Sequence, residues 1–286
     1  SADSMQVYKQ MDIGTAKIKK EQMQGVTHYM IDEWNPDEEF NVMIFQKHVK
    51  EIMEDIYNRG KIPILVGGTG FYIQAVLNDI AFTKEKQGDE IRADLQNLAK
   101  EKGASYLHHE LQKVDKESAE AIHPNNIKRV IRALEYFQST GQKFSDHNKE
   151  ERQKGSPYNF LYLVLTMNRK VLYERIDKRV DQMMEEGLVK EVKQLLDAGY
   201  SRNLVSMQGL GYKEIASALF KECTMEEAVY RLKRATRHFA KRQMTWFRRE
   251  RDVTMINKDN FSNNHEIVNY IMKLAVEKGI CSCREG

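Results

Sequence analysis

Ile62-Pro-Ile-Leu-Val-Gly-Gly-Thr-Gly-Phe-Tyr72 is the stretch that decides the fold. Its apolar run, Ile62–Val66, predicts a buried strand, and the turn after it predicts a loop at the carboxyl edge of a parallel sheet, where open α/β sheets bind ligands. The glycines permit close approach of the backbone and would hold Thr69 at the start of the next helix. A plain strand-to-helix turn is an equally good interpretation, because the glycine spacing matches no nucleotide-binding fingerprint.

The residues before this loop predict a βαβ unit. A short strand is expected at 26–34, and apolar residues at spacings of three and four predict an amphipathic helix over 42–56, which ends at Gly60. The strand at 62–66 would complete a right-handed crossover. A further short helix is expected at 71–77.

The pattern becomes helical between residues 83 and 156, where four helices precede a polar linker at 141–156. We interpret 83–156 as a helical insertion that divides an α/β core into two parts, 1–82 and 157–286. The second part is predicted to contain strands at 158–167 and 253–257, helices at 169–186, 189–198 and 265–278, and a long basic helix at 225–249.

Composition indicates an ordinary globular protein, because 41% of the 286 residues are hydrophobic and 30% are charged. Its size suits one large domain or a domain with an insertion. The sequence has no apolar run of about 18 residues, so we expect no membrane span. Three cysteines are too few for a disulfide framework, which favours the reducing cytoplasm.

Charge is distributed unevenly although the net charge is only +3. Residues 231–251 contain nine Lys and Arg residues against one acid, Glu250, for a net +8, so the rest of the chain sums to −5. Along the helix, Arg231, Arg234, His238 and Lys241 form a cationic stripe beside an apolar one. A solvated helix face is the plain alternative, but interleaved threonine and aromatic residues favour a polyanionic partner.

Five motifs resemble those of the tRNA dimethylallyltransferases, both in their residues and in their order along the chain. They extend across nearly the whole chain, and together they are specific although each one is weak. The resemblance implies a P-loop NTPase-like, nucleotide-binding (ATP-binding) core, with a parallel sheet flanked by helices, and a helical insertion domain that contacts tRNA. The motifs are Ser-Ala-Asp-Ser-Met-Gln-Val-Tyr8, Met-Asp-Ile-Gly-Thr-Ala-Lys17, Leu-Val-Gly-Gly-Thr-Gly-Phe-Tyr72, His-Pro-Asn-Asn126 with Arg-Ala-Leu-Glu135, and Ala-Thr-Arg-His-Phe-Ala-Lys-Arg-Gln-Met-Thr-Trp246.

The resemblance implies transfer of a dimethylallyl group from dimethylallyl diphosphate to N6 of the adenosine on the 3′ side of a tRNA anticodon. Asp3 matches the family's general base, a role worth about 10²–10⁴ in rate. Ser4, Met5 and Gln6 match further contacts to the substrate nucleotide, and Thr69 would face that nucleotide across the site from Asp3. The target base must leave the anticodon stack, at a cost of about a few kcal/mol.

The same resemblance assigns the cationic residues. Arg92, Arg129 and Arg132 match contacts to the tRNA anticodon stem-loop. We assign Arg237 and Arg242 to the diphosphate, where preorganised cations and Mg²⁺ would stabilise the charge that develops on departure. We expect the protein to be a monomer.

One departure from the family leaves other functions open. The family's phosphate loop, G-x-T-x-x-G-K-[ST], precedes the Ser-Ala-Asp segment and is absent from this sequence, which we expect to be a truncated record. A P-loop small-molecule or nucleoside kinase would instead phosphorylate a substrate with ATP. A non-catalytic tRNA-binding module would bind RNA in a salt-sensitive way without chemistry.

Overall fold

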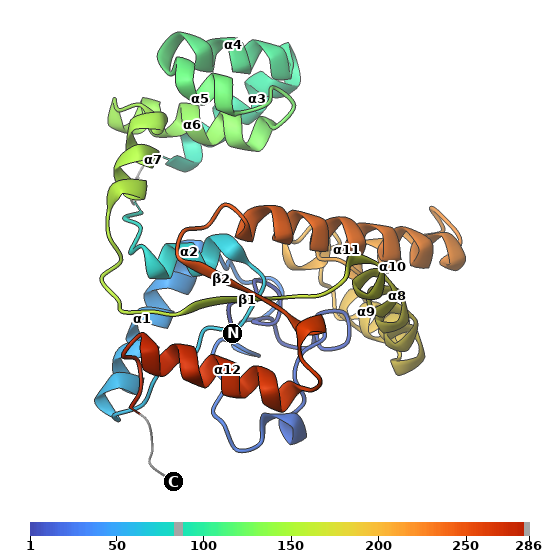
Figure 1. Cartoon of the computed structure of the whole chain (residues 1–286). Coiled ribbons are helices and arrows are strands. Elements are labelled where there is room, and N and C mark those ends of the chain that lie inside the picture. The colour runs from blue at the N-terminus through green and yellow to red at the C-terminus, as the bar shows by residue number, and fades with distance from the viewer. Residues whose placement is uncertain (83–87, 283–286) are drawn as a thin grey trace. The chain divides into compact units, whose positions relative to one another are not determined.

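The computed structural model describes residues 1–82 and 88–282, and the chain divides into two compact units (Figure 1). Ser1–Val76 and Tyr158–Gly286 form the first unit, and Leu77–Pro157 form the second. The chain therefore leaves the first unit once and returns to it. The insertion predicted at 83–156 overlaps the second unit, but its first predicted residue lies outside the described ranges, and its contact with tRNA stays a prediction.

The first unit contains a parallel pair of strands, β1 (Tyr162–Thr166) and β2 (Val253–Asn257). Tyr162 lies opposite Val253, and Thr166 lies opposite Asn257. Both predicted strands are confirmed, although β1 is shorter than the apolar run at 158–167. Its alternating side chains, buried at Tyr162 and Val164 and half exposed at Leu165, explain why a short apolar run forms a strand here.

The predicted buried strand at Ile62–Val66 is wrong. These residues have no regular secondary structure, and the side chains of Ile62, Ile64 and Val66 are 51%, 80% and 67% exposed. The amide of Ala2 donates a backbone hydrogen bond to the carbonyl oxygen of Val66, at 2.7 Å. An apolar run becomes a buried strand only when a ladder and a covering layer are both present, and the run itself specifies neither.

The strand predicted at 26–34 is also wrong. The segment is irregular, apart from one isolated parallel bridge between Trp34 and Tyr8. Non-glycine residues in the left-handed region, Met30 (φ 61°) and Asp32 (φ 58°), interrupt the extended backbone that a strand requires. The predicted βαβ unit is therefore represented by its helix, not by two paired strands.

Helices make up most of the first unit, and the predicted ones are confirmed with small shifts at their ends. In α1 the Asn41 side chain accepts from the amides of Met43 and Ile44, which starts the helix. Phe45 and Val49 then bury one face. The helices and helical turns are η1 (Lys20–Met23), α1 (Val42–Asn58), α2 (Gly70–Leu77), α8 (Arg169–Glu186), α9 (Leu188–Asp197), η2 (Ser206–Gln208), α10 (Tyr212–Leu219), α11 (Met225–Phe247), η3 (Lys258–Asn260) and α12 (Asn264–Glu277).

The second unit is built from α3 (Gly88–Lys102), α4 (Ala104–Val114), α5 (Lys116–Ala121), α6 (Ile127–Thr140) and α7 (Phe144–Gln153). Its four predicted helices are confirmed. They enclose a separate apolar core, which explains why the unit is compact by itself. The buried members of this core are Leu95, Leu107, Leu111, Ala119, Ile122, Val130, Ile131, Ala133 and Leu134.

The polar linker predicted at 141–156 is wrong, because most of it is helix α7. The residue before this helix, Lys143, makes no side-chain cap. The buried carboxylate of Asp115 supplies one instead, since its Oδ2 accepts from the amide of Ser145 at 2.8 Å. Phe144 packs against the apolar core. A cap from a residue distant in sequence leaves no local signal.

Candidate active site

Asp3 lies at a tight turn whose amides face its own carboxylate. Its Oδ1 accepts from the amides of Met5 at 2.8 Å and Gln6 at 3.3 Å. Burial raises the pKa of Asp3 above its ordinary value, while these two hydrogen bonds oppose the rise. A carboxylate held in one orientation, with a raised pKa, is suited to accept a proton.

Thr69 lies beside the residue that follows Asp3. Its Oγ1 accepts from the amide of Ser4 at 3.0 Å and donates to Ser4 Oγ, 3.3 Å away. The amide of Thr69 donates to the carbonyl oxygen of Ala2 at 3.2 Å. The structure therefore brings together the Asp3–Gln6 segment and Thr69, as the sequence predicts, and their contacts to a nucleotide stay a prediction.

The glycines around Thr69 admit neighbouring segments that a Cβ would exclude. A Cβ on Gly67 would lie 2.2 Å from the carbonyl oxygen of Ala2, and one on Gly70 would lie 2.3 Å from the indole of Trp246. Phe71 also meets Trp246 edge to face, with ring centroids 6.3 Å apart. The glycines therefore permit the close approach that the sequence predicts, and the loop lies between the Asp3 segment and α11, two neighbours that the sequence did not identify.

A second glycine-rich turn also packs against the Asp3 segment. A Cβ on Gly209 would meet the methyl group of Met5 at 2.6 Å, and one on Gly14 would meet the ring of Tyr212 at 2.6 Å. Met5 is thus packed against the turn before α10. The pattern Gly-Leu-Gly-Tyr212 before a helix was the available signal, but it identified no partner.

Arg237 of α11, assigned to the diphosphate, forms an ion pair with Asp177 of α8. One helical turn away, Lys233 pairs with Asp181 at 2.6 Å, so α8 and α11 are joined antiparallel by two matched pairs. A diphosphate would compete with Asp177 for the Arg237 guanidinium. Arg242 is exposed, and its guanidinium lies 5.6 Å from the ring centroid of Phe239. Neither contact tests the diphosphate assignment.

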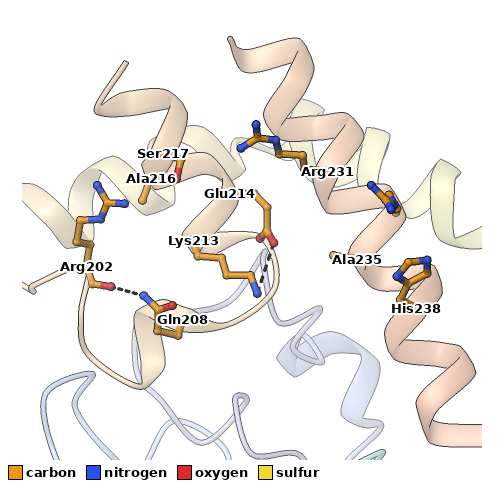
Figure 2. A pocket seen from close by; sticks show the side chains of 10 residues that line it. Arg202, Gln208, Lys213, Glu214, Ala216, Ser217, Arg231, Ala235 and His238 are labelled. Carbon is orange, nitrogen blue, oxygen red and sulfur yellow. Dashed lines mark hydrogen bonds and ion pairs between the residues drawn. The ribbon is translucent and has the colours of Figure 1, made fainter. Parts of the chain in front are cut away.

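A cationic hollow of about 480 Å³ lies between α10 and α11 (Figure 2). Arg231, Arg234 and His238, three members of the predicted cationic stripe, line it from α11. Two further cations line it, Arg202 from the segment that precedes α10 and Lys213 from α10 itself. The charge count over residues 231–251 missed both. Arg202 is already paired with Glu222, and Arg231 with Glu227, so the positive potential of the hollow is partly offset.

The arginines assigned to tRNA in the second unit share a buried carboxylate. Glu135 is 2% exposed, and both of its oxygens accept from Arg92, at 2.9 and 3.0 Å. Arg132 approaches the same carboxylate at 3.2 Å, whereas Arg129 is exposed. The charge of Glu135 therefore fixes two of the three side chains, and their contact with RNA stays a prediction.

Within residues 1–82 and 88–282, no group of three or more His, Cys, Asp or Glu side chains could hold a metal ion. Mg²⁺ is usually held by one or two carboxylates together with substrate phosphates, and the expectation of Mg²⁺ stays a prediction with no ligands assigned. None of the helices in the described part of the chain has the length and apolar content that a membrane crossing requires.

Known proteins resemble the chain over almost all of its length. The tRNA dimethylallyltransferase of Lachnoclostridium phytofermentans is 57% identical over 280 residues, which cover 98% of this chain and 90% of that protein. The tRNA dimethylallyltransferase of Acetivibrio thermocellus is 49% identical over 268 residues, which cover 94% of this chain and 86% of that protein.

A solved structure and a family model agree with these matches. The full-length tRNA isopentenylpyrophosphate transferase of Bacillus halodurans superposes with a TM-score of 0.71 at 44% identity, and the match covers 97% of this chain and 88% of that one. The chain therefore has the P-loop NTPase-like, mixed α/β fold of the tRNA prenyltransferases. The model of the IPP transferases matches residues 6–250. The chain belongs to this family of tRNA prenyltransferases.

Proposed function

We propose that this protein transfers the dimethylallyl group of dimethylallyl diphosphate to N6 of the adenosine on the 3′ side of a tRNA anticodon. Relatives named tRNA dimethylallyltransferase, 49–57% identical over nearly the whole chain, support this activity. The structural observation that carries the proposal is the oriented, half-buried carboxylate of Asp3 beside the Ser4–Thr69 hydrogen bond.

In the proposed reaction, Asp3 is the general base. The N6 nitrogen of adenosine forms a bond to the allylic carbon, the carbon–oxygen bond of the donor breaks, and diphosphate leaves with the bonding electron pair. The Oδ2 of Asp3, which makes no hydrogen bond to the turn, would take the proton that N6 loses. Thr69 would hold the nucleotide opposite this carboxylate.

The cationic residues would bind the two anionic substrates. Arg237 and Arg242 on α11 would bind diphosphate, and Mg²⁺, when bound, would supply further neutralisation of its charge. The hollow lined by Arg234 and His238, together with Arg129 of the second unit, would attract the RNA backbone. We further propose that the enzyme acts as a monomer, and that it acts in the cytoplasm, which the low cysteine content favours.

The proposal is tested with the full protein, labelled dimethylallyl diphosphate and an anticodon stem-loop that carries the target adenosine. The expected product is N6-(dimethylallyl)adenosine with one diphosphate released for each transfer. A stem-loop with guanosine at the target position is the matched control. ATP-dependent phosphorylation without RNA would favour a kinase, and RNA binding without transfer would favour a binding module.

A further inference from the structure

Glu191 of α9 is a buried carboxylate that receives three consecutive backbone amides from a distant loop. Its Oε2 accepts from Asp12 N at 2.9 Å and from Ile13 N at 2.7 Å, and its Oε1 accepts from Gly14 N at 3.1 Å. Three successive N–H groups that converge on one anion form a nest, which holds both the anion and the backbone that surrounds it.

Tyr212, the first residue of α10, completes this arrangement. Its hydroxyl donates to Oε1 of Glu191 at 2.7 Å, and its fully buried ring occupies the space beside Gly14 where a Cβ would lie. Burial, followed by the neighbouring charge of Glu191, raises the pKa of Tyr212, so the hydroxyl stays a donor. Each carboxylate oxygen thus has two donors.

The held loop is connected to the candidate base by two further hydrogen bonds. The carbonyl oxygen of Thr15 accepts from the side-chain amide of Gln6 at 3.2 Å. The backbone amide of Gln6 in turn donates to Oδ1 of Asp3 at 3.3 Å. A displacement of the loop would therefore be transmitted to Gln6 and to the orientation of the Asp3 carboxylate.

The charge of Glu191 argues for a role beyond packing. Burial of a carboxylate is costly, and an apolar side chain could fill the same volume without that cost. No apolar residue, however, could satisfy the amides of Asp12, Ile13 and Gly14 together. The cost of the buried charge is offset by the four hydrogen bonds that the carboxylate accepts, and three of them fix this loop.

We propose that Glu191 and Tyr212 are positioning residues for prenyl transfer, which fix the loop at residues 12–15 and, through Gln6, the orientation of Asp3. The inference rests on the proposed function, because the orientation of Asp3 affects the reaction only if Asp3 is the general base. Neither residue needs to touch a substrate for this role.

The central test is Glu191→Gln. Glutamine keeps the volume but replaces one acceptor oxygen with an NH₂ group, which cannot accept from the loop amides. We expect kcat to fall by roughly tenfold to a hundredfold, the scale of a small misplacement of a reactive group, while KM for dimethylallyl diphosphate stays within about twofold. Asp197→Asn, which loses an exposed ion pair with Lys193 on the same helix, is the matched control and should keep the parental kcat.

Tyr212→Phe provides a second test that keeps the ring beside Gly14 and removes only the hydroxyl. We expect a smaller loss of kcat than in Glu191→Gln. The double variant should be no slower than Glu191→Gln, because Tyr212 acts through that carboxylate. Tyr212→Phe decides the question if Glu191→Gln fails to fold.

Hydrogen exchange separates failure of this inference from failure of the proposed function. In the parent, the amides of residues 12–14 should be protected from exchange, and Glu191→Gln should reduce that protection. Faster exchange with a kcat within twofold of the parent would overturn the positioning role and leave prenyl transfer intact. A parent that transfers no prenyl group would overturn the proposed function and the inference with it. A roughly tenfold to hundredfold rise in KM for dimethylallyl diphosphate, with no change in kcat, would also overturn the inference.

Discussion

Gln243 and Gly68 join the basic helix to the glycine loop. The Nε2 of Gln243 donates to the carbonyl oxygen of Gly68 at 3.0 Å, and a Cβ on Gly68 would lie 2.1 Å from the same nitrogen. A Cβ at position 68 would therefore displace the Gln243 side chain and break this hydrogen bond between α11 and the loop. The contact with Gln243 accounts for the glycine at position 68 without a bound phosphate group. It also connects Thr69, one residue later, to the helix that carries Arg237.

The neighbouring glycines should differ in their tolerance of alanine. In Gly67→Ala the new Cβ would overlap the backbone of Ala2, which cannot move away without disturbing the Asp3 turn. In Gly68→Ala it would overlap only the end of the Gln243 side chain, which can rotate. We expect Gly67→Ala to cost about 1–3 kcal/mol of unfolding free energy and Gly68→Ala about 1 kcal/mol. Denaturant unfolding of both variants measures the difference, and equal costs would contradict it.

Asp3→Asn should separate stability from activity. Burial raises the folded-state pKa of Asp3 above its ordinary value of about 3.9, so the stability that this group contributes is fully present below that value and is lost as pH rises through the raised pKa. At neutral pH, Asp3→Asn should therefore melt at the parental temperature or higher. Its amide oxygen can still accept from Met5 and Gln6.

The activity of the same variant should nevertheless fall by about 10²–10⁴. In the parent, kcat should decrease as pH falls through the raised pKa of Asp3, because only the ionised carboxylate accepts a proton. Thermal unfolding at pH 4 and pH 7, together with a pH–rate profile, checks both effects. Full turnover by Asp3→Asn would remove Asp3 from the mechanism.

Thr69→Val should weaken the use of tRNA more than the binding of the prenyl donor. Valine has nearly the shape of threonine but cannot accept from the amide of Ser4, which then lacks its partner at the site of the target nucleotide. We expect KM for the stem-loop to rise about tenfold and KM for dimethylallyl diphosphate to stay within about twofold. Thr69→Ser, which keeps the hydroxyl, is the control. The reverse pattern would assign the loop to the phosphates of the donor.

Arg237 and Lys233 allow a matched comparison, because each pairs with one aspartate of α8. Both pairs are partly exposed, so Arg237→Gln and Lys233→Gln should each cost less than about 1 kcal/mol of unfolding free energy. Of these two variants, only Arg237→Gln should weaken inhibition by inorganic diphosphate, by about tenfold, because Arg237 is assigned to that ligand and Lys233 is not. Similar inhibition constants for the two variants would contradict the assignment.

The sequence predicts local elements well and tertiary relationships poorly, for physical reasons visible in particular residues. Apolar residues recur every three or four positions along α1, so the spacing of Phe45 and Val49 predicts a helix. The run at Ile62–Val66 is equally apolar but joins no ladder within residues 1–82 and 88–282. The helix α7 depends on a cap from Asp115, thirty residues before the Ser145 amide that it accepts from. Motif order predicts Asp3 and Thr69 as site residues, and their roles stay predictions. The buried carboxylate of Glu191 carries no motif, because its ligands are backbone amides that any sequence possesses.

Alanine at Arg129 and alanine at Arg92, both in the second unit, should have different effects on unfolding free energy, because only Arg92 pairs with a buried carboxylate. Arg129 is exposed, so Arg129→Ala should leave stability within about 0.5 kcal/mol of the parent. If Arg129 contacts a tRNA phosphate, the variant should bind the stem-loop more weakly, and the dependence of log Kd on log salt should fall by about one unit of slope. Arg92→Ala should in addition cost about 1–3 kcal/mol of unfolding free energy, because it removes the arginine that contacts both oxygens of the buried Glu135 carboxylate and leaves Arg132, 3.2 Å away, to pair with it. Titrations of labelled stem-loop at several salt concentrations, combined with thermal unfolding, distinguish the two effects. An unchanged salt slope in Arg129→Ala would place the RNA backbone elsewhere on the protein.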